Sequence, residues 1–279
     1  MTRALFVIFF SALVSAQTFR SSAEVVLITA NVTKDGRPVS GLSANDFQIT
    51  DNGAAQRVSL LQTDRMPIDV TIVLSAGDVR LIDPAFTSAM GFRSKLNSAD
   101  RLRVISAGDA IIESEPMTSV SKAPDYQHEG TRGNSFNDAL FYAFAWPTEP
   151  TRRHLVISYF INLDDWSTLD ASMLPKLARR TDAVVNVVTM EPGNLMMGNR
   201  RAGWDRDTAD LDRVARQTGG TMLPLAKAAK VFDQLLDEFR ASYVLQFTPA
   251  GSAAGWHALS VTVPSMRGVT IKARQGYER

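Results

Sequence analysis

Residues 68–74 read Ile-Asp-Val-Thr-Ile-Val-Leu, a short and mostly apolar run between Pro67 and Ser75. A strand that is apolar on both faces is typical of a sheet that helices cover on both sides. Comparable runs recur further along the chain, at Arg101–Ser106, His154–Ile161 and Ala183–Thr189. The run at 68–74 is therefore predicted to be the first strand of a sheet buried inside an α/β domain.

Helical patterns separate these apolar runs. They cover Ile82–Leu96, Ser135–Trp146, Thr168–Arg180, Asp207–Gln217 and Ala228–Arg240. Alternation of this kind predicts a doubly wound, mainly parallel sheet with helices on both faces, spanning residues 67–240. Asp109–Ser114 is expected to add an antiparallel edge strand. The aromatic residues Phe141, Tyr142, Phe144 and Trp146 share one predicted helix and are expected to lie in the core.

The flanking segments, residues 17–66 and 241–279, carry short strand patterns. The first contains the β-branched run Glu24–Val32 and two turn pairs, Asp35-Gly36 and Asn52-Gly53, that tolerate positive φ. The second contains alternating runs at Ser242–Thr248, Trp256–Val263 and Val269–Ala273. Strands this short need partners. We expect one small β-module, built from the N-terminal and C-terminal strands, with the α/β domain inserted between them.

The first sixteen residues have the pattern of an export signal. Arg3 supplies a positive charge, Ala4–Val14 is apolar, and Val14-Ser15-Ala16 offers small residues for cleavage before Gln17. The apolar run is shorter than the roughly 20 residues that a membrane-spanning helix needs. Residues 1–16 are therefore predicted to be a signal peptide, and the mature protein is expected to be periplasmic or secreted, with no membrane span.

Composition excludes several classes of function. The 279 residues include 30 basic and 29 acidic side chains, so no global field attracts nucleic acid. There is no cysteine, which excludes thiolate zinc sites and thiol nucleophiles. The three histidines do not have metal-ligand spacing, and no nucleophile elbow or phosphate loop occurs. The sequence gives no support for an enzyme, and an envelope hydrolase is the remote alternative.

Several phrases along the chain resemble one family. They are Val39–Phe47 closing with Asp51-Asn52-Gly53, Pro67–Val79, Ser98–Ile105, Leu211–Gly220, Tyr243–Phe247 and Lys272–Tyr277. In this order they are similar to exported bacterial VWFA-related proteins. The resemblance implies a von Willebrand factor type A (VWA) domain. It also implies a metal-ion-dependent adhesion site at the carboxyl edge of the sheet, where the parallel strands end.

The residues expected for that metal site are substituted here. The usual Asp-x-Ser-x-Ser corresponds to residues 74–78, where Leu74 replaces the carboxylate, Ala76 the first hydroxyl and Asp78 the second. Asn134 stands in the place of the usual Thr, unless a shift of one residue brings Ser135 there. Ile161 replaces the second carboxylate. Since Mg²⁺ prefers about six oxygen ligands, we expect no metal cofactor. The alternative is a relocated Mg²⁺ site that uses Asp78 with Asp164 or Asp165.

Recognition of a protein partner is the function that these observations favour. Candidate contacts at the carboxyl edge are Ser75, Asp78, Asn134, Ser135, Asp164 and Asp165. A second set lies on Asn194–Arg206, predicted to be a loop, and comprises Met196, Met197, Arg200, Arg201 and Trp204. Trp, Arg and Met are frequent in interfaces, but the same Met and Trp side chains could instead fold back onto the sheet. We therefore predict a non-catalytic, metal-independent interaction or adhesion module.

Overall fold

The computed structural model describes residues 25–61, 66–75, 93–119, 133–146, 151–160, 166–189, 199–250 and 253–279, with single positions at 87, 91 and 149. The predicted signal peptide and most of the predicted helix Ile82–Leu96 lie outside these residues. Among the described residues, no helix combines the length and apolar character needed to cross a membrane.

The central sheet has six strands in the order β11-β10-β9-β6-β7-β8. Their bounds are β6 Ile68–Ser75, β7 Arg101–Ala107, β8 Ile111–Ser119, β9 Arg153–Phe160, β10 Val184–Thr189 and β11 Met222–Pro224. Neighbours are parallel except β8, which pairs antiparallel with β7. The predicted doubly wound α/β fold is confirmed, and so is its antiparallel edge strand, which extends to Ser119.

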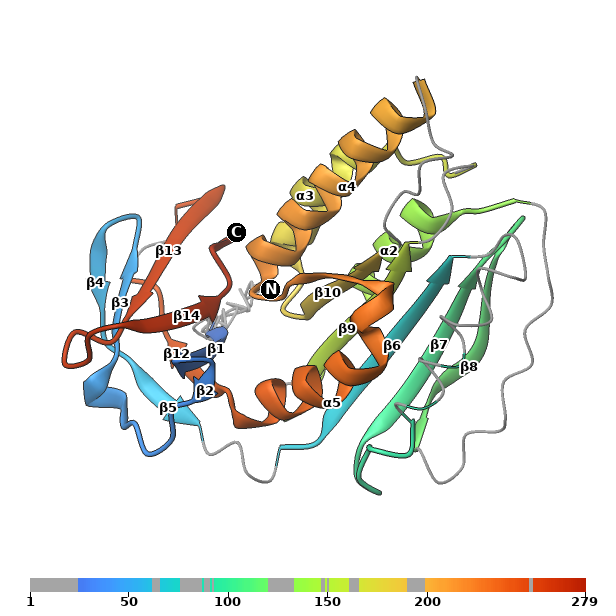
Figure 1. Ribbon diagram of the computed structural model, residues 1–279. Coiled ribbons are helices and arrows are strands. Elements are labelled where there is room, and N and C mark those ends of the chain that lie inside the picture. Colours follow the sequence, from blue (N-terminus) through green and yellow to red (C-terminus); the bar gives the residue numbers. More distant parts are fainter. Residues whose placement is uncertain are drawn as a thin grey trace, which may run out of the picture.

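Helices cover both faces of this sheet (Figure 1). Their bounds are α2 Phe136–Ala145, α3 Leu174–Leu177, α4 Asn199–Thr218 and α5 Leu225–Ala241. Side chains alternate between the faces of a strand, so Ile72 and Leu74 pack with α5, and Val73 packs with α2 and α4. All of β6 is buried, as the apolar run at 68–74 predicts.

Two predicted segments differ in form. The predicted helix Thr168–Arg180 is three short pieces, because the 3-10 turns η2 (Ala171–Met173) and η3 (Ala178–Arg180) flank α3. Asp170 accepts the N–H of Ser172, and Pro175 stands in the first turn of α3, where it can begin a helix but not continue one. The predicted loop Asn194–Arg206 is helical from Asn199 onward.

The β-module packs against α4 through β14 and against α5 through β1, two helices that lie on opposite faces of the central sheet (Figure 1). One of its sheets has the order β14-β1-β12-β5, with β2 also paired to β1, and the other has the order β15-β13-β3-β4. The strands are β1 Val26–Lys34, β2 Arg37–Pro38, β3 Gln48–Asp51, β4 Ala54–Gln56, β5 Ser59–Leu61, β12 Tyr243–Phe247, β13 Trp256–Thr262, β14 Val269–Ala273 and β15 Gly276–Glu278; the 3-10 turn η1 covers Ala44–Asp46.

Pairing between the two ends of the chain builds this module. Strand β1 lies between β12 and β14, and β3 pairs with β13. The turns at Asp35-Gly36 and Asn52-Gly53 have positive φ at all four residues, as their sequence predicts. N-terminal and C-terminal strands therefore depend on each other for their hydrogen bonds.

Candidate functional site

The strand order indicates which edge of the central sheet is the candidate binding edge. Along the chain, β6 is the first strand of the sheet and β9 the fourth, yet the two are neighbours. The connections run away from this pair in opposite directions, which makes it the switch point of the sheet. Ligands of open α/β sheets bind outside the carboxyl ends of the strands at such a point. The end of β6 and the loop before α2 lie at this candidate edge.

Leu74 and Ser75 close strand β6 at this edge. Leu74 is 1 % exposed and packs in the core with Ile72 and Tyr159. Ser75 is fully buried on the opposite face of the strand, and its Oγ has no hydrogen-bond partner among the described residues. The position expected to carry a carboxylate thus belongs to the hydrophobic core.

The loop before α2 is fixed by its own hydrogen bonds. Asn134 is fully buried, and its carbonyl accepts the N–H of Trp166 at 2.6 Å. Ser135 Oγ donates to the carbonyl of Gly108 at 2.9 Å. Both side chains lie in the structure where a second metal loop was expected, but the Ser135 hydroxyl proton is already engaged.

The described residues do not fit a magnesium site at this edge. They offer the hydroxyls of Ser75 and Ser135, the side chain of Asn134 and the carboxylate of Asp109, which already accepts the N–H of Gly133. Mg²⁺ requires about six oxygen ligands. Within the described ranges, no three His, Asp or Glu side chains come together in a way that could hold a metal ion. Ala76, Asp78, Ile161, Asp164 and Asp165 lie outside those ranges.

Three residues that the sequence analysis did not single out form a compact group here. The N–H of Gly133 donates to the carboxylate of Asp109. A Cβ atom on Gly133 would stand 2.6 Å from Asp109 Oδ1 and 2.7 Å from Trp166 Cε3. Only glycine fits between these two side chains. Trp166 itself is 64 % exposed, the largest exposed fraction among the described large apolar side chains.

The first turn of α2 holds the segment that carries Trp166. Asp138 accepts the N–H groups of Thr168 and Leu169 at 2.8 and 2.9 Å. In return, Ser167 Oγ accepts the N–H of Asp138 at 3.2 Å. A negative side chain in the first turn of a helix is also favoured by the helix dipole. These hydrogen bonds fix the backbone directly after Trp166, and with it the position of the exposed indole.

Further apolar surface lies on the same edge of the sheet. Ile111 and Ile112 begin β8, directly after the turn that follows β7, and are 37 % and 53 % exposed. Asp109 lies in that turn. The carboxyl edge thus presents exposed Ile and Trp side chains around the Asp109–Gly133 contact.

The second predicted set of partner contacts is only partly described. Trp204 is 2 % exposed and stacks on Phe160, with ring centroids 4.9 Å apart and planes at 26°. It is a core residue, so the alternative in which it folds back onto the sheet is the correct one. Arg200 and Arg201 belong to the first turn of α4, and Met196 and Met197 lie outside the described residues.

The predicted core aromatics of α2 divide into two groups. Phe144 is 7 % exposed, as expected, but Phe141 is 38 % exposed. Tyr142 and Trp146 cover the buried guanidinium of Arg103, whose Cζ lies 5.4 and 4.1 Å from their ring centroids. Burial lowers the pKa of Arg103. Sequence periodicity shows which side chains share a face but not that a cation lies beneath them.

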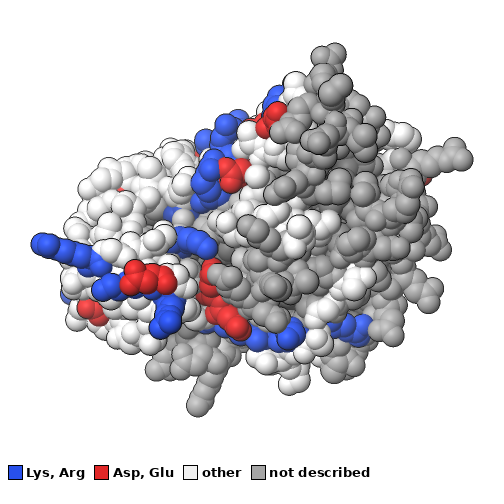
Figure 2. Space-filling view, in the orientation of Figure 1, with Lys and Arg blue, Asp and Glu red and all other residues white. Residues whose placement is uncertain are grey.

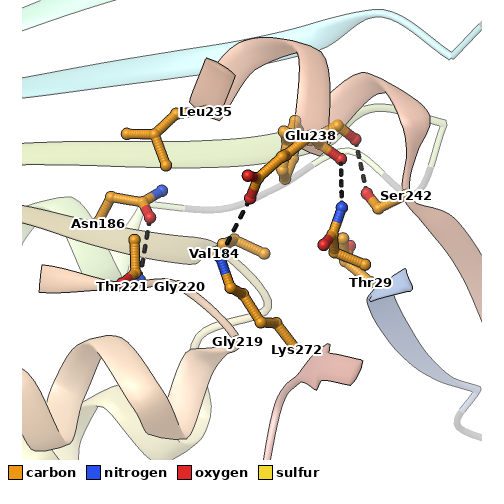
Figure 3. A pocket seen from close by; sticks show the side chains of 12 residues that line it. Thr29, Val184, Asn186, Gly219, Gly220, Thr221, Leu235, Glu238, Ser242 and Lys272 are labelled. Atoms are coloured by element: carbon orange, nitrogen blue, oxygen red, sulfur yellow. Dashed lines mark hydrogen bonds and ion pairs between the residues drawn. The ribbon is translucent and has the colours of Figure 1, made fainter. Parts of the chain in front are cut away.

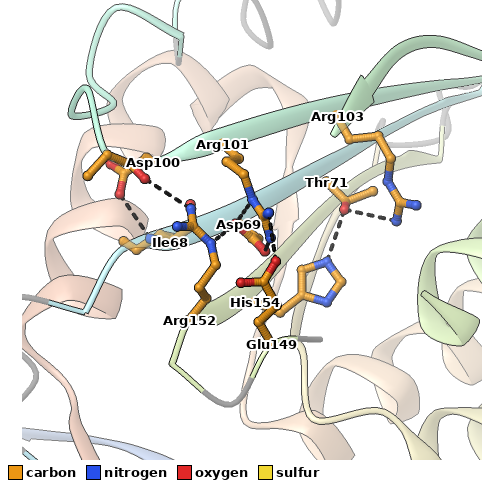
Figure 4. A network of polar contacts seen from close by, with 10 residues as sticks. Ile68, Asp69, Thr71, Asp100, Arg101, Arg103, Glu149, Arg152 and His154 are labelled. Atoms are coloured by element: carbon orange, nitrogen blue, oxygen red, sulfur yellow. Dashed lines mark hydrogen bonds and ion pairs between the residues drawn. The ribbon is translucent and has the colours of Figure 1, made fainter. Parts of the chain in front are cut away.

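A polar network occupies the opposite end of the sheet (Figure 4). Arg101 and Arg152 both bind the carboxylate of Asp69, which is 3 % exposed, and Arg101 also pairs with Glu149 at 2.8 Å. These contacts join the starts of β6, β7 and β9. The network therefore neutralises buried charge and fixes strand ends, which is a structural role.

Thr71 and His154 lie beside this network and have the composition of a nucleophile and a base. Thr71 Oγ1 and His154 Nε2 are 3.0 Å apart. However, Thr71 is fully buried and His154 is 5 % exposed. Burial lowers the pKa of His154 to about 4, so the ring is neutral at pH 7. A pair that no substrate can reach is not an active site.

A small cavity of about 30 Å³ lies between the β-module and the α/β unit (Figure 3). Asn31 Nδ2 donates to the carbonyl of Glu238 at 3.1 Å, and Lys272 Nζ pairs with the Glu238 carboxylate at 3.1 Å. The volume admits one or two water molecules. This cavity belongs to the packing of the two units and is too small for a metabolite.

No protein-family model matches the sequence, and no curated protein matches it. Solved structures similar to the chain include VWA proteins. An aerotolerance-related membrane protein from Bacteroides fragilis aligns with 62 % of this chain and 98 % of its own, at 12 % identity and a TM-score of 0.42. An ArnB paralogue from Sulfolobus acidocaldarius aligns with 90 % and 75 %, at 8 % identity and 0.47.

A von Willebrand factor type A protein from Catenulispora acidiphila covers 92 % of this chain and 75 % of its own, at 10 % identity and a TM-score of 0.46. Likenesses of this size do not indicate what the chain binds. The α/β fold itself rests on the strand order and pairing described above.

Proposed function

We propose that this chain is a non-catalytic, VWA-related interaction module that binds a protein partner through the carboxyl edge of its central sheet, without a metal ion. The observation that carries the proposal is Trp166, 64 % exposed at the switch-point edge and fixed against Gly133. Export to the periplasm or beyond belongs to the same proposal and rests on the pattern of residues 1–16.

The energetics of protein interfaces support this role for Trp166. Tryptophan is among the residues most often found at the centre of interfaces. Binding costs less free energy when the contacting side chain is already ordered. The hydrogen bonds from the first turn of α2 to residues 167–169 provide that order.

Charge distribution supports a specific partner rather than a polyanion. On the face shown in Figure 2, Lys and Arg side chains are interspersed with Asp and Glu over the described residues. The whole chain has a formal net charge of +1. Nucleic acid binding is driven by clustered positive charge, and this face does not offer it.

Metal independence is supported by the burial of Leu74 in the core, where a carboxylate would otherwise face the ion. A leucine side chain cannot supply an oxygen ligand. The end of β6 would also have to move before position 74 could face an ion and not the core. The relocated site at Asp78 with Asp164 or Asp165 is the competing proposal, and the experiment below distinguishes the two.

The test is affinity capture from the envelope fraction of the source cells with three forms of the full chain. These are the wild type, Trp166→Ala, and the control Val25→Ala, which removes a 48 % exposed apolar side chain from the β-module. We expect a captured partner to persist in the control and to be lost with Trp166→Ala, and a chelator to change neither result.

Two outcomes would contradict the proposal. Retention of the partner by Trp166→Ala would exclude the carboxyl edge as the contact surface. Loss of the partner on chelation, together with saturable Mg²⁺ binding in calorimetry that Asp78→Ala abolishes, would establish the relocated metal site instead.

A further inference from the structure

A buried histidine in the β-module connects three segments of the chain. His257, on β13, is 6 % exposed. Its Nδ1 lies 2.9 Å from Asp51 Oδ1 on β3, and its Nε2 lies 2.9 Å from the carbonyl oxygen of Ala253. The ring stacks on Tyr277 of β15, with centroids 4.8 Å apart and planes at 24°. We call Asp51, Ala253, His257 and Tyr277 the His257 cluster.

Both ring nitrogens of His257 face oxygen atoms that only accept. A neutral imidazole carries one N–H, so one of its nitrogens would direct a lone pair at an oxygen. Only the imidazolium, with two N–H groups, satisfies Asp51 and Ala253 together. The second oxygen of Asp51 accepts the hydroxyl of Tyr277 at 2.8 Å, so the carboxylate is held in place from the other side.

The hydrogen-bond geometry points to a pH-sensitive contact: we propose that protonated His257 holds residues 253–255, directly before β13, against β3 and β15, and that loss of its proton releases these residues. The charged or titratable groups that act on the ring are Asp51 from β3, Tyr277 from β15 and Arg279, directly after β15. Deprotonation leaves the Asp51 contact intact through one N–H and removes the donor to Ala253.

Electrostatics act in the same direction as the geometry. The hydrogen bond to Ala253 raises the pKa of His257, and so do the hydrogen bond and charge of Asp51; burial and Arg279 oppose them. The net result is a pKa above the ordinary value of about 6.5. The imidazolium and its contact with Ala253 therefore persist below that pKa, and the contact is lost as the pH rises through it.

The backbone next to Ala253 shows where release would be measured. Gly255 and Arg279 exchange two backbone hydrogen bonds, each of 3.0 Å. These bonds extend the pairing of β13 with β15 beyond Trp256. If the segment before β13 is freed, the amides of Gly255 and Arg279 lose protection against exchange before the paired amides of β1 and β12 do.

The test begins with an NMR titration of the wild-type full chain, so it does not depend on a variant that folds. We expect His257 to titrate above pH 6.5 and His154 to titrate far below it, near 4. Protection factors of Gly255 and Arg279 should fall as the pH rises through the pKa of His257. The fall should be about tenfold for each unit by which that pKa exceeds 6.5.

Two variants complete the test. Asp51→Asn keeps the size of the side chain and removes its charge, so the pKa of His257 should fall toward its ordinary value. His257→Gln has no group that titrates, so the protection factors of Gly255 and Arg279 should no longer depend on pH. A His257 pKa at or below 6.5 in the wild type, or protection that stays constant through its titration, would overturn the proposal.

Discussion

At the scale of single residues, Gly133 is a tightly packed position of the carboxyl edge. Gly133→Ala places a Cβ 2.6 Å from Asp109 Oδ1 and 2.7 Å from Trp166 Cε3. Because both neighbours must move, we expect a loss of about 1–3 kcal/mol in the free energy of unfolding. Denaturant unfolding measures this loss, and partner capture should weaken because Trp166 is displaced.

Gly203, in the helix α4, is the matched control. A Cβ there meets nothing within 4 Å, and alanine favours a helix over glycine by up to about 1 kcal/mol. Gly203→Ala should therefore stabilise the protein or leave it unchanged. Equal losses for the two substitutions would show that the Asp109–Gly133–Trp166 contact is not tight.

His154 makes the free energy of unfolding depend on pH in the acidic range. Its pKa in the folded chain is about 4 because of burial, and about 6.5 when unfolded. Between these values the unfolded chain binds a proton that the folded chain does not, so stability falls as the pH drops from 6.5 to 4. The full effect is about 3 kcal/mol.

The measurement compares denaturant unfolding of the wild type and His154→Gln across this pH range. Other carboxyl groups contribute to both proteins, so the difference between the two slopes isolates His154. The wild type should lose stability more steeply on acidification. Parallel curves would mean that His154 is already protonated in the folded protein or is accessible to water.

At the scale of elements, Arg153 closes the C-terminal end of α5. It donates to the carbonyls of Phe239 and Arg240 and to Ser242 Oγ, and its guanidinium lies 4.1 Å from the ring centroid of Phe239. Positive charge near the end of a helix satisfies its free carbonyls. Burial lowers the pKa of Arg153 to about 10, which leaves it charged at neutral pH.

Arg153→Met should cost about 2–4 kcal/mol, because the buried carbonyls lose their donors. Thermal or denaturant unfolding measures the change, and amide exchange should locate the loss at the last turn of α5. Arg206→Met is the control, since that side chain is 73 % exposed and should change stability by no more than about 0.5 kcal/mol. Similar effects of the two substitutions would exclude the capping role.

The elements also show what sequence patterns can predict. Apolar strands and the turns at Asp35-Gly36 and Asn52-Gly53 were predictable because burial and positive φ restrict residue types at the position itself. The start of α4 was missed because its first turns are rich in Arg, Asp and Gly. The sequence nevertheless carried an indication of this helix, because Trp204 and Leu211 are seven residues apart, as on one face of a helix, and both are buried.

The residues of the candidate site, too, were only partly predictable from the sequence. The resemblance to VWA domains located Leu74, Asn134 and Ser135 at the carboxyl edge, because their place follows from the strand order. It did not find the contact of Asp109, Gly133 and Trp166, which joins three loops. Their sequence separations of 24 and 33 residues leave no periodic trace, and only the folded chain brings them together.

At the scale of the whole molecule, the C-terminal phrase Lys272–Tyr277 ties the β-module to the α/β unit. Gln275 N–H donates to the carbonyl of Gln217 at 2.9 Å, and Arg274 Nη2 donates to that of Arg179 at 3.3 Å. A Cβ on Gly219 would stand 2.9 Å from the backbone of Ala273. Backbone contacts this close leave little freedom between the units.

Such an interface predicts one cooperative unfolding transition for both units. Each contains a buried histidine, His257 in the β-module and His154 in the α/β unit, and their ring signals in NMR report on the units separately. We expect both native signals to disappear at the same denaturant concentration, because β1 has its neighbours in β12 and β14 and its Asn31 caps α5.

Arg274→Met should lower the unfolding midpoints of both units together, since it weakens the shared interface. Two separate midpoints in the wild type would show that the α/β unit is stable without the β-module, and the C-terminal phrase would then be an attachment rather than part of one folding unit.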